Sequence, residues 1–120
     1  MVDIIDLKKK STKITEQWHP GIIGKLNDYH LKLAKLQGEF VWHSHPETDE
    51  LFLVVDGAMG IEFRDHSITL ISGQACVVPA GMEHKPFAER ECTVMLIEPA
   101  GTINTGDAGG DFTVEELEWL

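Results

Sequence analysis

The sequence predicts an all-β domain folded as a sandwich or a jelly-roll barrel. Short runs of residues alternate with period two, as expected for strands that present one face to a core. No internal repeat or low-complexity tract interrupts the pattern. Turn-forming residues separate the runs at short intervals: Gly21, Gly24, Gly38, Gly57, Gly60, Gly73, Gly81, Pro46, Pro79, Pro86 and Pro99.

The length of the chain fits a single domain. With 120 residues, it can bury one core but not two independent ones. We expect a core barrel over about residues 28–100, an N-terminal arm over 1–27, and a C-terminal loop with a short helix over 101–120. The apolar runs are too short to span a membrane. The N-terminal sequence MVDIIDLKKK lacks the order of a secretory signal, so we expect a cytoplasmic protein.

The charge balance argues against nucleic acid and anionic membrane as partners. Ten basic residues against twenty acidic ones give a formal charge of -10. Affinity for a phosphate backbone rests on Lys and Arg. We therefore expect a small-molecule ligand, with no nucleic-acid or membrane partner.

The alternation of side chains between two faces, with a period of two residues, identifies the central strands. It is visible from Tyr29 to Ala34, through the run LFLVV at 51–55, and around Ile61 to Phe63. In the run LFLVV, the residues that point to one face of the strand and those that point to the other are all apolar. We therefore expect this strand to be covered on both faces. Residues 64–68 predict a hairpin turn that contains Asp65 and leaves His66 in solvent.

The two ends of the chain carry weaker patterns. The arm before Gly21 holds an isolated Ile14 and a turn at residues 18–20, and it can pair with the sheet edge or with a second subunit. The Gly-rich residues 100–111 are interpreted as a connector, with a loop that closes one mouth of the barrel as the alternative. Thr113 and Glu116 fit a capping box, which predicts a short docked helix up to Leu120.

Four side chains form a candidate metal site: His43, His45, Glu50 and His84. Residues two apart on a strand point to the same side, with Cα atoms roughly 6.5 to 7 Å apart, so His43 and His45 can reach one ion. Residues 46–49 break the strand, and Glu50 opens the next one. His84 follows the turn at Pro79 and Gly81, and can complete the set from a strand that is distant in sequence.

The donor set predicts the kind of metal. Three imidazoles and one carboxylate suit one divalent transition metal (Fe, Mn, Ni, Zn, Co or Cu) better than Ca or Mg, which prefer oxygen ligands. An octahedral ion would keep two positions for water or substrate. Such open positions distinguish a working site from a sealed structural one.

The spacing of these residues resembles the two sequence motifs of the cupin family. The first motif orders Gly, His-x-His, Glu and Gly, and it is matched by Gly38, His43, His45, Glu50 and Gly57, with four residues rather than five after Gly38. The second is matched by Gly73, Pro79, Gly81 and His84, with Ala88 where Asn is expected. The match covers residues 38–88, and the fifteen residues between Gly57 and Gly73 resemble the compact spacing of small bacterial single-domain cupins.

The resemblance implies a fold and a site. The implied fold is a double-stranded β-helix (jelly-roll, cupin) barrel, with His43, His45, Glu50 and His84 as the metal ligands and with frequent dimerisation, so we expect a homodimer. The chain is similar to mannose-6-phosphate isomerase-like and dioxygenase-like small cupins. Since fold does not fix function, this similarity does not identify a reaction.

Other polar and apolar residues receive weaker assignments. Val41, Phe52 and Val54 share strand parity with the ligands and are expected to line the cavity. Glu47 is expected in solvent, and Cys76 and Cys92 as reduced, buried thiols. No catalytic acid or base is assigned, because four further candidates are interpreted as surface residues: Tyr29, His30, Lys32 and Glu83.

Two functional classes remain compatible with the sequence. In the first, a metal-dependent enzyme of the dioxygenase, isomerase or lyase type acts on a small polar molecule such as a sugar, keto acid or phenolic compound. In the second, the barrel binds a metal or small ligand without turnover, as a sensing or storage module. Turnover would need a proton-transferring group beyond the four ligands and a closing loop, and a binding module needs neither.

Overall fold

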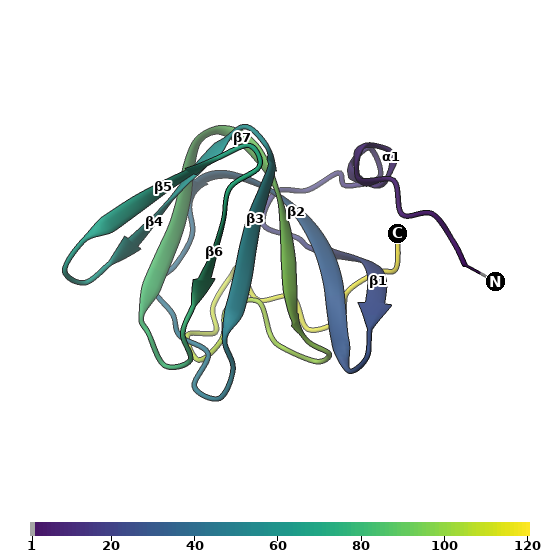
Figure 1. The fold of residues 1–120 in the computed structure, drawn as a ribbon. Coiled ribbons are helices and arrows are strands. Elements are labelled where there is room, and N and C mark those ends of the chain that lie inside the picture. Colours follow the sequence, from purple (N-terminus) through teal and green to yellow (C-terminus); the bar gives the residue numbers. More distant parts are fainter. Residues whose placement is uncertain (1) are drawn as a thin grey trace.

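The structure is a computed structural model that describes residues 2–120. Among these residues, no helix has the length and apolar character needed to cross a bilayer. One short helix and seven strands are formed (Figure 1): α1 (Leu7–Ser11), β1 (Gly21–Leu26), β2 (Tyr29–Glu39), β3 (Glu50–Asp56), β4 (Ala58–Phe63), β5 (Ser67–Ile71), β6 (Ala75–Val78) and β7 (His84–Pro99).

The strands form an antiparallel sheet that curves into the predicted jelly-roll barrel. The order β1-β2-β7-β3-β6 makes up most of it, and the β4–β5 hairpin joins through β7. β7 is long enough to connect the two parts, because its first residues pair with β4 and its later residues pair with β3. The expected turn joins β4 to β5 at residues 64–66, and His66 is exposed there. The all-β prediction is therefore confirmed.

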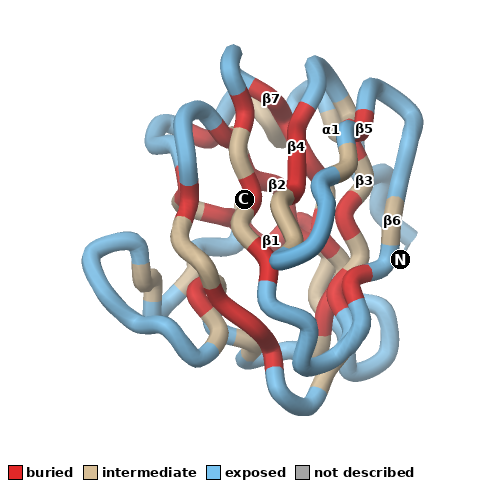
Figure 2. Tube along the Cα trace, turned by 90° about the vertical axis from the view of Figure 1, so that its left-hand side faces the viewer, coloured by how far each residue is buried: buried red, intermediate tan, exposed pale blue. Residues whose placement is uncertain are grey.

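The main core fills the inside of the barrel. Inward residues of β2, β3 and β7 meet there, and Phe52 pairs with Leu96 while Val54 pairs with Val94. Figure 2 shows buried residues along the strands and exposed residues in the connections between them. The outer face of β3 is only half-buried, so the expectation that this strand is covered on both faces is only partly met.

The N-terminal arm packs on its own barrel. Residues 21–26 of the expected arm form β1, which pairs with β2. The side chain of Ile14 is buried against Ile23 and Leu33 on the outside of the sheet. Trp18 donates its backbone N–H to the carbonyl oxygen of Lys35 and stacks on Phe40, with ring centroids 4.7 Å apart. Within the single chain, residues 21–26 of the arm pair with the sheet as β1, and contact of the arm with a second subunit stays a prediction.

The predicted C-terminal helix is wrong. Residues 113–120 are irregular, with a bend at 115–116 and a single bridge at Trp119, and their end lies along the edge of β1. The backbone N–H of Ile22 donates to the oxygen of Glu118, and the N–H of Leu120 donates to the oxygen of Ile22, both at 2.8 Å. The N–H of Val114 donates to Asn104 Oδ1, which ties this segment to the loop that follows β7. The open edge of β1 offers hydrogen bonds that an isolated short helix cannot match.

Candidate metal centre

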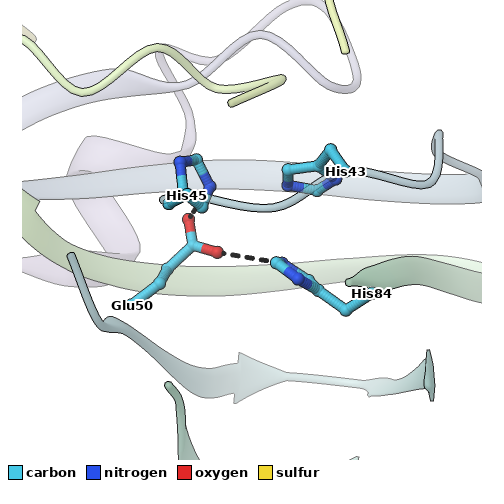
Figure 3. Close-up of side chains that lie close together, drawn as sticks. All are labelled: His43, His45, Glu50 and His84. Carbon is cyan, nitrogen blue, oxygen red and sulfur yellow. Dashed lines mark hydrogen bonds and ion pairs between the residues drawn. The ribbon is translucent and has the colours of Figure 1, made fainter. Parts of the chain in front are cut away.

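The four predicted ligands come together inside the barrel. His43 and His45 lie in the segment between β2 and β3, Glu50 begins β3, and His84 begins β7. Their potential ligand atoms all lie within 4.8 Å of one another (Figure 3). All four side chains are buried, with exposed fractions between 0 and 5%. The four side chains singled out from the sequence therefore form one compact cluster.

Backbone pairing holds the ligands in place. His43 and His84 exchange two hydrogen bonds, from each N–H to the other residue's carbonyl oxygen, at 3.0 and 2.9 Å. The N–H of Gly81 donates to the oxygen of His45. The expected strand through both His43 and His45 is reduced to one bridge at His43, because the chain turns there toward Pro46. The β6–β7 turn instead supports His45.

Hydrogen bonds fix the tautomers of two of the imidazoles. Nδ1 of His43 lies 3.0 Å from the carbonyl oxygen of Val41, and Nδ1 of His84 lies 2.9 Å from that of Met82. A carbonyl oxygen only accepts, so Nδ1 carries the proton in each ring. In the neutral imidazole, Nε2 then presents a lone pair. This arrangement is typical of metal-ligating histidines.

The centre of the cluster is suited to a cation. Nε2 of His84 lies 3.3 Å from Oε1 of Glu50, and Nε2 of His45 lies 3.4 Å from Oε2. A lone pair facing a carboxylate is repulsive unless a proton or a metal ion lies between them. Metal–nitrogen bonds of about 2.0 to 2.1 Å would place opposite ligands of an octahedral ion about 4 Å apart, close to the observed spread. The cluster thus fits an ion after a small contraction.

The protonation states suit metal binding. Burial lowers the pKa of His43 to about 4, so its imidazole is neutral at neutral pH. Burial opposes ionisation of Glu50, but its contacts with the imidazoles of His45 and His84 outweigh burial and hold the pKa of this carboxyl below its ordinary value. Metal ligands must be deprotonated, and both groups already are.

A small cavity adjoins the cluster. It has a volume of about 40 Å³, and His43 and Glu50 form part of its wall. Of the residues expected to line it, Phe52 does so, whereas Val54 and Val41 pack within the main core. The lining is otherwise mostly apolar: Trp18, Pro20, Ala34, Leu36, Phe40, Pro86, Val94 and Leu96, with Glu98 and Asn104 as further polar members.

Sequence reasoning missed a buried ion pair beside the ligands. Lys32, interpreted as a surface residue, is 1% exposed, and its Nζ donates to Oε1 of Glu98 at 2.7 Å. Burial, together with the charge on Glu50, raises the pKa of Glu98 to about 8, and the Lys32 ammonium opposes that rise. The sequence did hold a sign that Glu98 is buried. Glu98 lies two residues after Leu96 and four after Val94, so its side chain points to the same inward face of the strand.

The loop that follows β7 covers the cavity. Asn104 contributes to the cavity wall, and the side chain of Thr105 is fully buried. Asp107 accepts hydrogen bonds from the backbone N–H and the hydroxyl of Ser44, between the two histidines, at 2.9 and 3.1 Å. The interpretation of residues 100–111 as a plain connector is therefore wrong, and the closing loop is observed.

The remaining candidates lie away from the cluster. Glu83 is exposed and accepts a hydrogen bond from Arg64 at 2.9 Å, and Tyr29 and Glu47 are exposed as expected. His30 is half-buried, with its ring edge 5.3 Å by centroid from Trp119. Cys76 and Cys92 are free thiols, and only Cys92 is fully buried.

Comparison with known proteins identifies the family. Residues 30–98 match the family described as Cupin domain. A solved cupin-2 domain protein from Shewanella frigidimarina is 48% identical, with a TM-score of 0.79 over 80% of this chain and 94% of that one. A solved protein from Neisseria meningitidis is 35% identical, with a TM-score of 0.75 over 82% of this chain and 100% of that one. The chain belongs to the cupin family.

A curated relative covers the chain in part. The uncharacterized protein YdbB of Bacillus subtilis is 36% identical over 64 residues, which are 52% of this chain and 57% of the relative. The chain spans between 32% and 57% of the length of the curated relatives it matches. These similarities support the fold and the family, and they leave the reaction to be argued from the site.

Proposed function

We propose that this cupin binds one divalent transition metal ion through His43, His45, Glu50 and His84 and presents it to a small molecule in the adjoining cavity. The observation that carries the proposal is the meeting of imidazole lone pairs and a carboxylate in a buried cluster. When bound, the ion would act as a Lewis acid or redox centre. Three nitrogens and one oxygen favour Fe, Mn, Co, Ni, Cu or Zn over Ca or Mg.

We further propose that the site supports turnover, as a metal-dependent enzyme of the dioxygenase, isomerase or lyase type. Two features support this choice over a sensing or storage module. Glu98 is a titratable group beside the cluster that is not among the four ligands. The loop over residues 101–111 covers the cavity and would exclude water from a reaction. The candidate substrates remain sugars, keto acids and phenolic compounds.

Elemental analysis of the purified protein tests metal binding. We expect about one metal ion per chain in the wild type and clear loss in His84→Ala, which removes a ligand with 0% exposure. His66→Ala is the matched control, because His66 lies in the exposed β4–β5 turn and should leave the metal content unchanged. Equal metal content in all three proteins would remove His84 as a ligand.

A turnover screen separates the two functional classes. The metal-loaded protein is offered sugars, keto acids and phenols, with oxygen consumption and product formation as readouts. If none of these is converted and no oxygen is consumed, the binding module becomes the better description.

The assembly is also a proposal. We propose a homodimer and relatedness to the mannose-6-phosphate isomerase-like subtype from the sequence resemblance, and we keep a cytoplasmic location as an expectation from the sequence. Exposed apolar residues near the N-terminus, Val2 and Ile4, offer surface for a second copy. Light scattering in solution measures the oligomeric state directly.

A further inference from the structure

The loop that closes the cavity is hydrogen-bonded directly to the segment that carries two of the candidate ligands. Ser44 lies between His43 and His45, whose side chains both belong to the cluster (Figure 3). Its backbone N–H donates to Oδ1 of Asp107 at 2.9 Å, and its hydroxyl donates to Oδ2 at 3.1 Å. The N–H of Asp107 donates in return to the carbonyl oxygen of Ser44, also at 3.1 Å. These hydrogen bonds join one residue of the loop to one residue of the ligand segment.

The contact holds the two peptide groups on either side of Ser44. The N–H of Ser44 belongs to the peptide that joins it to His43, and the carbonyl oxygen belongs to the peptide that joins it to His45. Both are bonded to Asp107. Ser44 is 7% exposed, so water has little access to replace these bonds while the loop is closed. Because the two peptide planes are held, the directions in which both histidine side chains leave the backbone are held as well.

His45 depends on the loop more than His43 does. Nδ1 of His43 is fixed by the carbonyl oxygen of Val41. No carbonyl oxygen accepts a hydrogen bond from the ring of His45 among the residues that the structure describes, although Gly81 bonds to its backbone oxygen. Gly106 lies against this ring, since a Cβ there would be 3.2 Å from Nδ1 of His45. The loop therefore supports a ligand that the barrel alone holds less firmly.

We propose that Asp107 is a positioning residue for His43 and His45, so that closure of residues 101–111 over the cavity and metal binding stabilise each other. The inference rests on the proposed metal site. Coupling between two equilibria is reciprocal, so a loop that favours the metal-binding arrangement of the histidines is itself held closed by the bound metal. A loop that only covers the cavity would show no such dependence.

Zinc affinity measures one side of the coupling. Dissociation constants for Zn(II) are obtained by competition with a chelator. Asp107→Ala should bind zinc about tenfold more weakly than the wild type, as is usual when a group that orients a metal ligand is removed. Asp107→Asn should stay near the wild-type value, because its amide oxygen can accept from the N–H of Ser44 and its amide nitrogen can donate to the hydroxyl. Glu47→Ala is the control, since it removes an exposed charge two residues from His45.

Hydrogen exchange of the loop measures the other side. The N–H groups of Gly106, Asp107 and Ala108 are hydrogen-bonded in the closed loop, so their exchange reports its opening. In the wild type, saturating zinc should slow this exchange about tenfold, the same factor as the loss of affinity, because the coupling is reciprocal. Zinc should not slow it in Asp107→Ala, nor in His84→Ala, which lacks a candidate ligand.

Asp107 is exposed, so its replacement should leave the barrel folded. If Asp107→Ala does not fold, Ser44→Ala takes its place: it removes only the hydroxyl bond and should weaken zinc binding by a smaller factor. Zinc affinity unchanged in the variant that folds would overturn the proposal. So would Asp107→Asn binding as weakly as Asp107→Ala, because the effect would then come from charge and not from hydrogen bonds.

The zinc content of the wild type is measured first, because it separates this inference from the proposed function. Less than stoichiometric zinc in the wild type would refute the proposed metal site. About one zinc per chain, with loop exchange equally fast in the presence and absence of zinc, would refute only the role of Asp107.

Discussion

His43 and His84 are hydrogen-bonded to each other through their backbones in both directions, at 3.0 and 2.9 Å. This pair joins the segment after β2 to the start of β7, although the residues are forty-one positions apart in the sequence. Their rings consequently lie 4.3 Å apart by centroid. Because the contact is made by the main chain, it persists when either side chain is replaced. Ligand substitutions should therefore change metal binding more than they change the fold.

The buried imidazole of His43 should make the metal-free fold sensitive to acid. Its pKa falls from 6.5 to about 4 on folding, because burial disfavours the charged form. Between these pH values the unfolded chain takes up the proton first, so stability is present above pH 6.5 and is lost as the pH falls toward 4. The loss attributable to this group is about 3 kcal/mol. Urea unfolding of metal-free protein at pH 7 and pH 4.5 measures it.

His43→Gln is the control for that experiment, since its amide does not titrate. The variant should lose less stability than the wild type between the two pH values, and shared contributions from other groups cancel in the difference. Equal losses in both proteins would show that His43 is not the group responsible.

Breaking the Lys32–Glu98 pair should be costlier than removing it. Lys32→Met leaves the Glu98 carboxyl buried without its partner, which would cost about 3–5 kcal/mol if the carboxyl stayed charged. Because the pKa of Glu98 is already raised to about 8 and Lys32 opposes that rise, the carboxyl should take up a proton in this variant, and the cost should fall below that range. The double replacement with Met removes both charges and should unfold at or above the wild-type urea midpoint. The comparison is valid because both side chains are only 2% exposed. A double variant as unstable as the single one would mean that the pair contributes more than mutual neutralisation.

Gly106 should be the least replaceable residue of the closing loop. It has a φ of +54°, and a Cβ there would lie 2.1 Å from the carbonyl oxygen of Ser44. Gly106→Ala should therefore displace the loop from the histidine segment, destabilise the protein by more than the ordinary cost of about 1–2 kcal/mol for left-handed backbone, and lower the metal content. Unfolding midpoints and elemental analysis provide the two measurements.

Gly109→Ala is the matched control for the loop. Gly109 has a similar φ of +64°, but no atom lies within 4 Å of the position that a Cβ would take there. This variant should lose only the stability that a left-handed backbone costs an alanine, and it should keep its metal. If the two alanine variants behave alike, the close approach of Gly106 to Ser44 is not what closes the cavity.

The two thiols should differ in reactivity. Cys92 is fully buried, and burial raises its pKa to about 11. Cys76 is partly exposed, although burial and then the charge on Glu50 raise its pKa as well. A thiol-reactive disulfide reagent at pH 8 should label Cys76 slowly and Cys92 only after unfolding. Cys76→Ser should therefore abolish labelling of the folded protein, and rapid labelling of Cys92 would contradict its burial.

The candidate ligands could be predicted from the sequence because local rules place them. His43 and His45 are two residues apart, Glu50 opens a strand after a turn, and His84 follows a Pro-Gly turn. Each feature fixes the direction of a side chain over a few residues. The family spacing then indicates that these local pieces meet, and the structure brings their ligand atoms together.

Features that depend on distant partners could not be predicted in this way. The C-terminal residues satisfied a helix pattern, but hydrogen bonds between Ile22 and the segment ending at Leu120 extend them along β1 instead. Lys32 had the sequence context of a surface residue, and only its position opposite the inward face of β7 makes it a buried partner of Glu98. Both outcomes depend on which surfaces remain open after the barrel closes.

By itself, the sequence determined the all-β class and the identity of the four candidate ligands, because strand alternation, turn residues and motif spacing act over short stretches of chain. The tertiary structure decided the course of the two chain ends, the closure of residues 101–111 over the cavity, and the buried charge pair beside the cluster. These depend on hydrogen bonds and burial between segments far apart in the chain. Such contacts form only when the barrel brings those segments together.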